Sequence, residues 1–298
     1  MNRESTTTRL RRTLDYEQAG PTAARMLLGA RLRRLREAAH ISQEDASDAI
    51  RGSESKISRM ETGRIGFKLR DVTELLDLYG VGEDERATLL ALAGHANIPG
   101  WWQAYGEVIP GWFEPYLGLE QAAELIRTYQ VQFVPGLLQT PDYARAVSRI
   151  GAGVTTWRET DQRVSLRLRR QQILRRPSPP RLWAVIDEAA LRRPIGGAAV
   201  ARGQLRHLIE MAQLNHVNIQ VAPFSGGSRA IAGGPITMLR FAEAELTDVV
   251  YLEQDASAAL LTRSAERLYY WNVLNRLATE ALPPAKTEAM LHAILRET

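Results

Sequence analysis

Cysteine is absent from the sequence, which excludes disulfide bonds, thiolate metal sites and cysteine nucleophiles. No apolar run approaches the roughly 18 residues that would suggest a transmembrane helix. Residues 1–12 are polar and basic, so they lack the apolar stretch of a signal peptide. These absences predict a cytoplasmic protein with no membrane partner.

Signatures of catalysis and metal binding are missing as well. The five histidines are scattered, without the His-x-x-x-His or Glu-x-x-His spacing of a metal site. The sequence has no Gly-x-Ser-x-Gly nucleophile elbow and no Gly-x-x-x-x-Gly-Lys phosphate-binding loop. We therefore expect no enzyme, no catalytic residue, no metal ion and no cofactor.

Basic charge is concentrated near the start of the chain. Residues 1–70 hold 15 Lys and Arg against 9 Asp and Glu, whereas the remaining residues hold 23 against 25. A basic segment on a near-neutral body suggests an anionic partner for that segment alone. With 298 residues, the chain is long enough for two domains.

Periodicity and turn residues divide the chain into four regions. Residues 1–20 are polar, with basic side chains between Arg9 and Arg12, and suggest a flexible arm that either contacts the anionic partner or is a solvated tail. Residues 21–96 carry helical periodicity with short connections. Residues 97–115 form a linker rich in Pro, Gly and Trp, and residues 116–298 mix helical and strand patterns.

These patterns predict an α+β protein that is mainly α, with a five-helix bundle at 21–96 and a mixed α/β domain with a small sheet at 116–298. In the second region, helices are expected at Leu119–Tyr129, Pro141–Ile150, Thr156–Arg175, Ala198–Leu214, Ser264–Leu282 and Pro284–Glu297. Strands are expected at Leu182–Ile186, Asn218–Ala222, Thr237–Phe241 and Asp248–Leu252.

Within the bundle, one helix has its apolar face at Leu28, Leu32 and Leu35. Four more are expected at Ser42–Ile50, Ser53–Glu61, Leu69–Tyr79 and Glu83–His95. Ser42 is the expected N-cap of its helix, with Asp45 three residues on, and Gly63 is expected to end the Ser53–Glu61 helix.

The helices Ser42–Ile50 and Ser53–Glu61 have the pattern of a helix-turn-helix. Small residues at their contact, Ala46 and Ser47, would let them cross closely. The apolar seam between them would consist of Ile50, Ile57 and Met60. The outer face of the second helix is then polar, at Glu54, Ser55, Ser58 and Arg59. A helix of this kind fits the major groove of DNA and presents side chains to base edges.

The stretch from Ser42 to Arg64 resembles the phage-repressor-like (Xre-type) helix-turn-helix family. The resemblance is carried by Ser42-Gln43, Ile57-Ser58-Arg59 and Glu61-Thr62-Gly63-Arg64. The sequence departs from the family in the turn, where Arg51 stands at the usual place of glycine and Gly52 follows one residue later. A solvated helical face is the alternative reading of the polar residues.

The resemblance implies binding to double-stranded DNA. It implies base-reading roles for Glu54, Ser55, Ser58 and Arg59, and phosphate contacts for Gln43, Ser53, Lys56 and Arg64. One recognition helix touches only a few base pairs, so a homodimer on two half-sites about one helical turn apart is expected. The C-terminal helices could supply the interface through Leu268, Tyr269, Trp271, Leu274 and Leu277, which could equally form an intramolecular core.

The second region resembles the effector domain of unassigned function that follows Xre-type motifs in actinobacterial regulators. The resemblance is carried by the run Val134–Arg145 and by Arg169-Arg170-Gln171, Asp187–Arg192, Gln204-Leu205, Gly234-Pro235 and Val250–Glu253. It covers the chain from about Trp101 onward. It implies a regulator of development or secondary metabolism, often encoded beside a small partner protein.

Polar residues of this region could line a ligand or partner pocket. The candidates are Gln139, Tyr143, Arg145, Glu188 and Arg192. Gln139, Tyr143 and Arg145 could instead satisfy buried backbone, and the acidic pair that contains Glu188 could cap a helix. One long helix is decorated by Arg163, Arg167, Arg169, Arg170, Arg175 and Arg176. Those arginines form a solvated face, a second DNA contact or a partner surface.

The sequence therefore predicts a cytoplasmic transcriptional regulator, associated with the nucleoid when bound to DNA. Its second domain would sense an unknown small-molecule effector, dimerise, or both. The alternative is an antitoxin-like protein that binds a small protein through its second domain and autoregulates its own operon. An enzyme carried on a DNA-binding module is a third reading, which the missing catalytic signatures disfavour.

Overall fold

The computed structural model describes residues 16–150, 156–226, 233–254 and 256–298, so most of the expected arm lies outside the described residues. The chain forms two compact units. Unit 1 consists of Met1–Gln103, Gly118–Ala122 and Phe241–Thr247. Unit 2 consists of Ala104–Leu117, Ala123–Arg240 and Asp248–Thr298.

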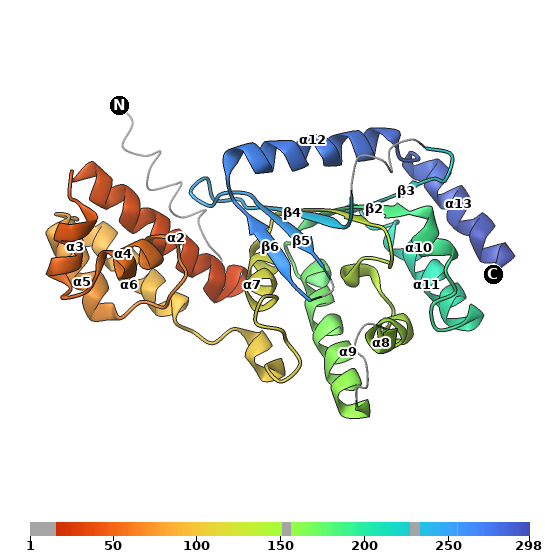
Figure 1. Ribbon diagram of the computed structural model, residues 1–298, viewed down its shortest axis with the longest axis horizontal. Helices are drawn as coiled ribbons and strands as arrows, with labels where there is room; N and C mark the ends of the chain where they lie inside the picture. Colours follow the sequence, from red (N-terminus) through yellow and green to blue (C-terminus); the bar gives the residue numbers. More distant parts are fainter. Residues whose placement is uncertain (1–15, 151–155, 227–232, 255) are drawn as a thin grey trace. The chain divides into compact units, whose positions relative to one another are not determined.

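Unit 1 contains the five helices that the sequence predicts (Figure 1). They are α2 (Tyr16–Ala38), α3 (Gln43–Ala49), α4 (Glu54–Glu61), α5 (Leu69–Leu78) and α6 (Glu83–Ala96). Helix α2 is broken near its start at Gly20, where φ is 75° and proline follows. The helix beyond this break buries Leu28 and Leu32 completely or almost completely.

Close backbone contact joins α2 to α4. A Cβ atom added at Gly29 would lie 2.4 Å from the carbonyl oxygen of Met60. A Cβ atom at Gly63, where φ is +65°, would lie 2.7 Å from the Cα of Met26. Glycine therefore serves two purposes at position 63, because the end of α4 needs a left-handed residue and the space beside it is filled.

Unit 2 is built on a six-stranded sheet in the order β3-β2-β1-β4-β5-β6. The strands are β1 (Leu125–Gln130), β2 (Arg181–Asp187), β3 (Val217–Ala222), β4 (Ile236–Arg240), β5 (Val249–Glu253) and β6 (Ala258–Leu261). The first three are parallel to one another, and each later neighbour is antiparallel. Strand β5 therefore runs in the direction of β1, so β1, β2, β3 and β5 end at the same edge.

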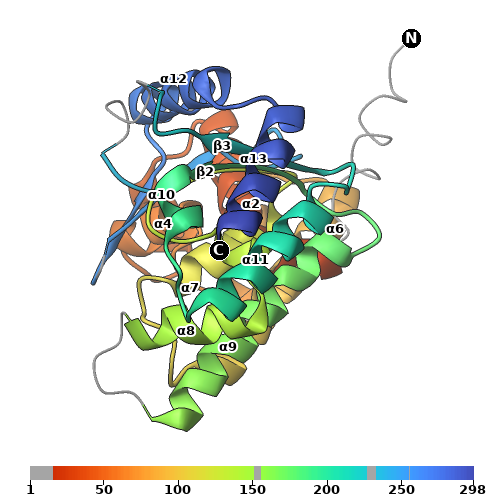
Figure 2. The same cartoon turned by 90° about the vertical axis from the view of Figure 1, so that its right-hand side faces the viewer.

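The helices of unit 2 cover both faces of this sheet. The parallel strands are connected by α8 (Pro141–Ile150) and α9 (Trp157–Gln171), then by α10 (Glu188–Arg192) and α11 (Ala198–Met211). Helix α12 (Ser264–Glu280) lies along the opposite face in Figure 1. Its residues Val273, Leu274 and Leu277 join the buried cluster against that face. Helix α13 (Pro284–Glu297) packs beside α11, as Figure 2 shows.

The remaining ordered pieces are short. They are the helix α7 (Glu114–Ala122) and the 3₁₀ turns η1 (Trp101–Tyr105), η2 (Gly136–Leu138) and η3 (Gln172–Arg175). No helix among the described residues is both long and apolar enough to cross a bilayer.

The prediction of an α+β fold is confirmed, and the four expected strands lie within one residue of their observed bounds. One prediction is wrong: Leu119–Tyr129 is not a single helix. Helix α7 ends at Ala122, and the chain enters β1, whose four central residues are all buried. A strand buried on both faces shows no alternation, so its pattern cannot be told from that of a buried helix.

Candidate DNA-binding surface

Local capping begins both helices of the helix-turn-helix. Ser42 forms a complete capping box with Asp45: the serine Oγ accepts from the Asp45 amide at 3.0 Å, and the carboxylate accepts from the Ser42 amide at 3.3 Å. At the start of α4, the Ser53 Oγ accepts from the Lys56 amide at 3.3 Å. These bonds satisfy amides that would otherwise lack a helical partner, and they fix where each helix begins.

The crossing of α3 and α4 has the predicted composition. Ala46 is fully buried and Ser47 is 5 % exposed, so small side chains lie at the helix contact. Ile50, Ile57 and Met60 are buried, as the expected apolar seam requires. Burial of this seam leaves the opposite side of α4 facing solvent.

The turn between the two helices contains a left-handed residue. Arg51 has a φ of 50°, a conformation that glycine adopts more easily than any side-chain-bearing residue. A Cβ atom added at Gly52 would lie 3.2 Å from side-chain atoms of both Ile50 and Lys56. Arg51 therefore adopts the left-handed conformation of this turn. Gly52, which has no side chain, avoids a close contact with Ile50 and Lys56.

A buried ion pair attaches the end of α4 to α2. Arg36 donates to both carboxylate oxygens of Glu61, from Nε at 2.6 Å and from Nη2 at 3.1 Å. Gln43 donates to the same carboxylate at 3.0 Å, which adds α3 to the network. The hydrogen bond to Glu61 raises the pKa of Arg36. From the sequence, Glu61 is recognisable only as part of a motif, because its partner lies 25 residues earlier in the chain.

The four predicted base-reading residues all lie exposed on α4: Glu54, Ser55, Ser58 and Arg59. The Arg59 Nε donates to the Ser55 carbonyl at 3.1 Å, so the side chain lies along its own helix. Its terminal guanidinium nitrogens make no hydrogen bond with the described residues. This face offers hydroxyl, carboxylate and guanidinium groups to an outside partner.

The four predicted phosphate-binding residues differ in their surroundings. Ser53 and Arg64 are exposed at the two ends of α4. The Gln43 side chain is partly buried and bonded to Glu61. The Lys56 ammonium lies 2.6 Å from a carboxylate oxygen of Asp71 in α5, a contact that the sequence did not indicate.

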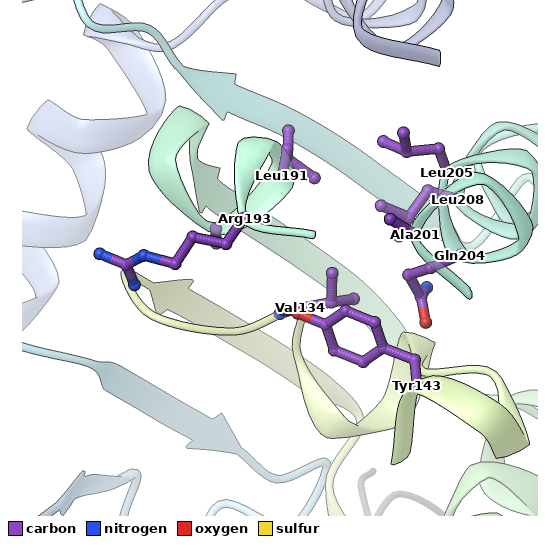
Figure 3. Close-up of a pocket in the computed structure, with 9 residues that line it drawn as sticks. Val134, Tyr143, Leu191, Arg193, Ala201, Gln204, Leu205 and Leu208 are labelled. Atoms are coloured by element: carbon purple, nitrogen blue, oxygen red, sulfur yellow. Dashed lines mark hydrogen bonds between the residues drawn. The ribbon is translucent and has the colours of Figure 1, made fainter. Parts of the chain in front are cut away.

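In unit 2, one of the five predicted pocket residues lines a small cavity. Tyr143 lies on α8 at the wall of this space, together with Val134, Arg193 and Gln204 (Figure 3). The cavity encloses about 10 Å³, roughly enough for the centre of one water molecule. Arg193 and Gln204 also line this cavity but were not among the predicted pocket residues. Arg192 and Arg193 are adjacent in the sequence, and no pattern there indicates which of the two lines a cavity.

The other four predicted pocket residues do not line this cavity and contact other residues of the chain. Gln139 donates to the Val134 carbonyl at 2.7 Å. Arg145 pairs with Asp142 and Asp161 on the surface of α8 and α9. Glu188 is buried, 2.6 Å from Arg192, and accepts from the Phe224 amide at 2.7 Å. Arg192 also pairs with Glu297 at 2.6 Å.

Comparison with protein families gives two matches. Residues 27–89 match a helix-turn-helix domain, which agrees with the geometry of α3 and α4 and points to DNA binding. Residues 113–293 match a domain of unknown function, DUF5753. The chain belongs to this family, since the match spans more than half of its residues. Comparisons with curated proteins and with solved structures gave no match.

Proposed function

We propose that the protein is a transcriptional regulator that binds double-stranded DNA sequence-specifically, with α4 as its recognition helix in the major groove. The observation that carries this proposal is the solvent-facing polar side of α4 above a fully buried seam. We assign this helix-turn-helix to the Xre type, with Arg51 in the left-handed turn position. A short, rigidly supported helix is the usual means of presenting side chains to base edges.

Arg59 is the residue best suited to read a base. Arginine can donate two parallel hydrogen bonds to the O6 and N7 atoms of guanine. The intrahelical bond from Arg59 Nε to a carbonyl orients the side chain, and its terminal nitrogens remain for such a contact. We propose that Glu54, Ser55 and Ser58 read neighbouring positions, while Ser53 and Arg64 contact phosphate.

The test is selection of duplexes from a random pool by the full chain, followed by titration of the selected site. Arg59→Ala should lose about 1–3 kcal/mol on the selected site, or about 5- to 150-fold in affinity, and little on random DNA. Arg33→Ala is the matched control, because Arg33 is an exposed arginine on α2 paired with Glu37. Equal weakening on all sequences would remove the base-reading role.

We further propose that the protein acts as a homodimer in the bacterial cytoplasm, with α12 of unit 2 as the contact. Leu268 and Tyr269 are 61 % and 59 % exposed on this helix, an unusual exposure for such side chains. Two recognition helices are needed to span two half-sites, which favours a second copy as the occupant of this face. A small partner protein is the alternative occupant.

A further inference from the structure

Strand β6 (Ala258–Leu261) forms one outer edge of the sheet in unit 2. Its neighbour in the sheet is β5, to which it is antiparallel. Within the part of the chain that the structure describes, no other residue forms a hydrogen bond to the backbone of β6 on its outer side. Alternate amides and carbonyls of an edge strand point away from the sheet, so β6 offers donors and acceptors to a further strand.

The opposite edge of the same sheet is closed by the chain itself. In β3, the Val221 amide donates to the Thr287 hydroxyl of α13 at 3.2 Å. The Val221 carbonyl accepts from the Leu282 amide, which follows α12, at 2.8 Å. The fold therefore satisfies the outward backbone groups of β3 with its own residues, whereas it leaves those of β6 to another partner.

The sequence of β6 lacks the usual protection of an exposed edge. Its four residues are Ala-Ala-Leu-Leu, without a charged side chain or a proline. Proteins commonly place lysine, other charged residues or proline on open edges to prevent pairing with a second chain. Ala259 and Leu260, the two middle residues of β6, are exposed. An uncharged strand of this kind can pair with an identical strand without repulsion between like charges.

Helix α12 brings apolar side chains to the same edge. It begins at Ser264, directly after β6, and near its other end the Ala278 carbonyl accepts from Gln220 of β3 at 3.1 Å. The helix thus crosses the sheet from the β6 edge to the β3 edge (Figure 1). Leu268 and Tyr269, both more than half exposed, lie in its first two turns, on the side of β6. An open strand edge and an apolar surface therefore lie close together.

A second copy of the chain matches both features at once. When an edge strand pairs antiparallel with its own copy, the two-fold axis is perpendicular to the sheet, because directly opposite side chains must lie on the same face. The two α12 helices then lie on one face of a continuous sheet, and both begin beside the axis. The combined surface is self-complementary, a property that a second copy requires and that an unrelated protein does not.

We propose that two copies of the chain associate through β6, whose antiparallel pairing joins the two six-stranded sheets into one. Leu268 and Tyr269 of both copies pack together beside this junction. Short strands contribute few hydrogen bonds, so burial of these side chains supplies a large part of the association free energy. The inference rests on the homodimer proposed above and specifies how its two copies are joined.

The test uses the absence of cysteine from the chain, since a single introduced thiol can form a disulfide only with a second copy. In a symmetric pair centred on Ala259 or Leu260, the central residue faces its own copy with Cα atoms about 4.5–5.5 Å apart, a distance that suits a disulfide. Ala259→Cys and Leu260→Cys are oxidised in dilute solution, and covalent dimers are counted on non-reducing gels. At least one variant should cross-link about tenfold or more faster than the control, because pairing raises the effective thiol concentration.

The matched control is Leu214→Cys, because Leu214 is 38 % exposed, against 37 % for Leu260, and lies just before β3 at the closed edge. In a second measurement, Leu260→Lys should raise the dimer Kd about three- to tenfold, since like charges then meet across the pair. Leu214→Lys should leave this Kd unchanged. Circular dichroism establishes that each variant retains the fold.

Light scattering of the unmodified chain tests the homodimer separately from its mode of pairing. If the chain is a dimer but neither β6 variant cross-links faster than Leu214→Cys, the pairing through β6 is overturned and the homodimer stands. Cross-linking by Tyr269→Cys in that case would restrict the contact to α12. A monomeric chain would overturn both proposals and leave the edge to a different protein.

Discussion

Charged side chains of unit 1 differ in their surroundings: some are buried and pair within the protein, whereas others are exposed to solvent. Glu61 is 7 % exposed and accepts three hydrogen bonds from Arg36 and Gln43, so it holds three helices together. Arg59 is exposed two residues earlier on the same helix, and its side chain donates to the Ser55 carbonyl as its one hydrogen bond among the described residues. The same eight-residue helix thus has one charged residue buried in an ion pair and another exposed, for which we propose a contact with DNA.

Replacing Glu61 by Gln should destabilise the protein by about 3 kcal/mol, because it leaves the Arg36 guanidinium buried beside a neutral group. Urea unfolding followed by circular dichroism measures the change. Glu37→Gln is the matched control, since Glu37 pairs with Arg33 at an exposed position and its loss should leave stability unchanged. Similar stabilities for the two variants would show that the buried pair does not hold α4 in place.

Lys56 is the residue whose proposed role competes with an observed contact. If its ammonium binds phosphate, Lys56→Ala should weaken all DNA binding and lower the salt slope by about one unit. Asp71→Asn should then preserve or strengthen binding, because it releases the ammonium from its 2.6 Å partner. Fluorescence anisotropy over a series of salt concentrations measures both. A salt slope unchanged by Lys56→Ala would restrict this lysine to the ion pair with Asp71.

At the scale of elements, the position of α4 depends on backbone proximity as much as on side-chain packing. Helix α2 approaches the end of α4 through Gly29, where a single added carbon would overlap the Met60 carbonyl. The apolar seam with α3 fixes the opposite side of the helix. A helix held on two sides can present its outer face in one orientation.

Gly29→Ala should therefore lower stability by about 1–3 kcal/mol, since the new Cβ would lie 2.4 Å from a backbone oxygen that cannot rotate away. Gly94→Ala is the control within α6, where no atom lies within 4 Å of the added Cβ. That exchange should stabilise by up to about 1 kcal/mol through helix propensity. Thermal melting of both variants is the measurement, and equal melting temperatures would contradict close packing at Gly29.

At the scale of the whole molecule, the proposed recognition of two DNA half-sites would require a second copy of the chain. The exposed side of α12 carries Leu268 and Tyr269, whereas its buried side carries Leu274 and Leu277 in the core of unit 2. The sequence suggested that these residues form either an interface or a core. In the structure, some of them are exposed on one side of α12 and the others are buried on the opposite side. This division supports the dimer proposal for the exposed pair alone.

The double exchange Leu268→Lys and Tyr269→Lys should convert the dimer to a monomer and weaken binding to a palindromic site by at least about tenfold, because the second recognition helix is lost. Light scattering after size-exclusion chromatography measures the mass. Ile150→Lys is the control, an equally exposed apolar residue at the end of α8. An unchanged mass in the double variant would place the interface elsewhere or leave α12 to another protein.

The helix-turn-helix could be predicted in detail because its signals are local. The Ser42–Asp45 capping box, the small residues at the crossing and the glycine that ends α4 all act within a few residues. The partners that complete this surface could not be predicted in the same way. Glu61 and Arg36 are 25 residues apart, and Lys56 and Asp71 are 15 apart, so no periodic pattern connects them.

The class of fold, the helices of unit 1 and the exposed face of α4 follow from the order of the residues alone, since caps, turns and periodicity are short-range properties. Tertiary structure alone decided that 125–130 is a strand, because β1 obtains its hydrogen bonds from β2 and β4, more than 50 residues further along the chain. It also decided which side of α12 is buried. Those properties depend on distant neighbours, and only the folded chain brings them together.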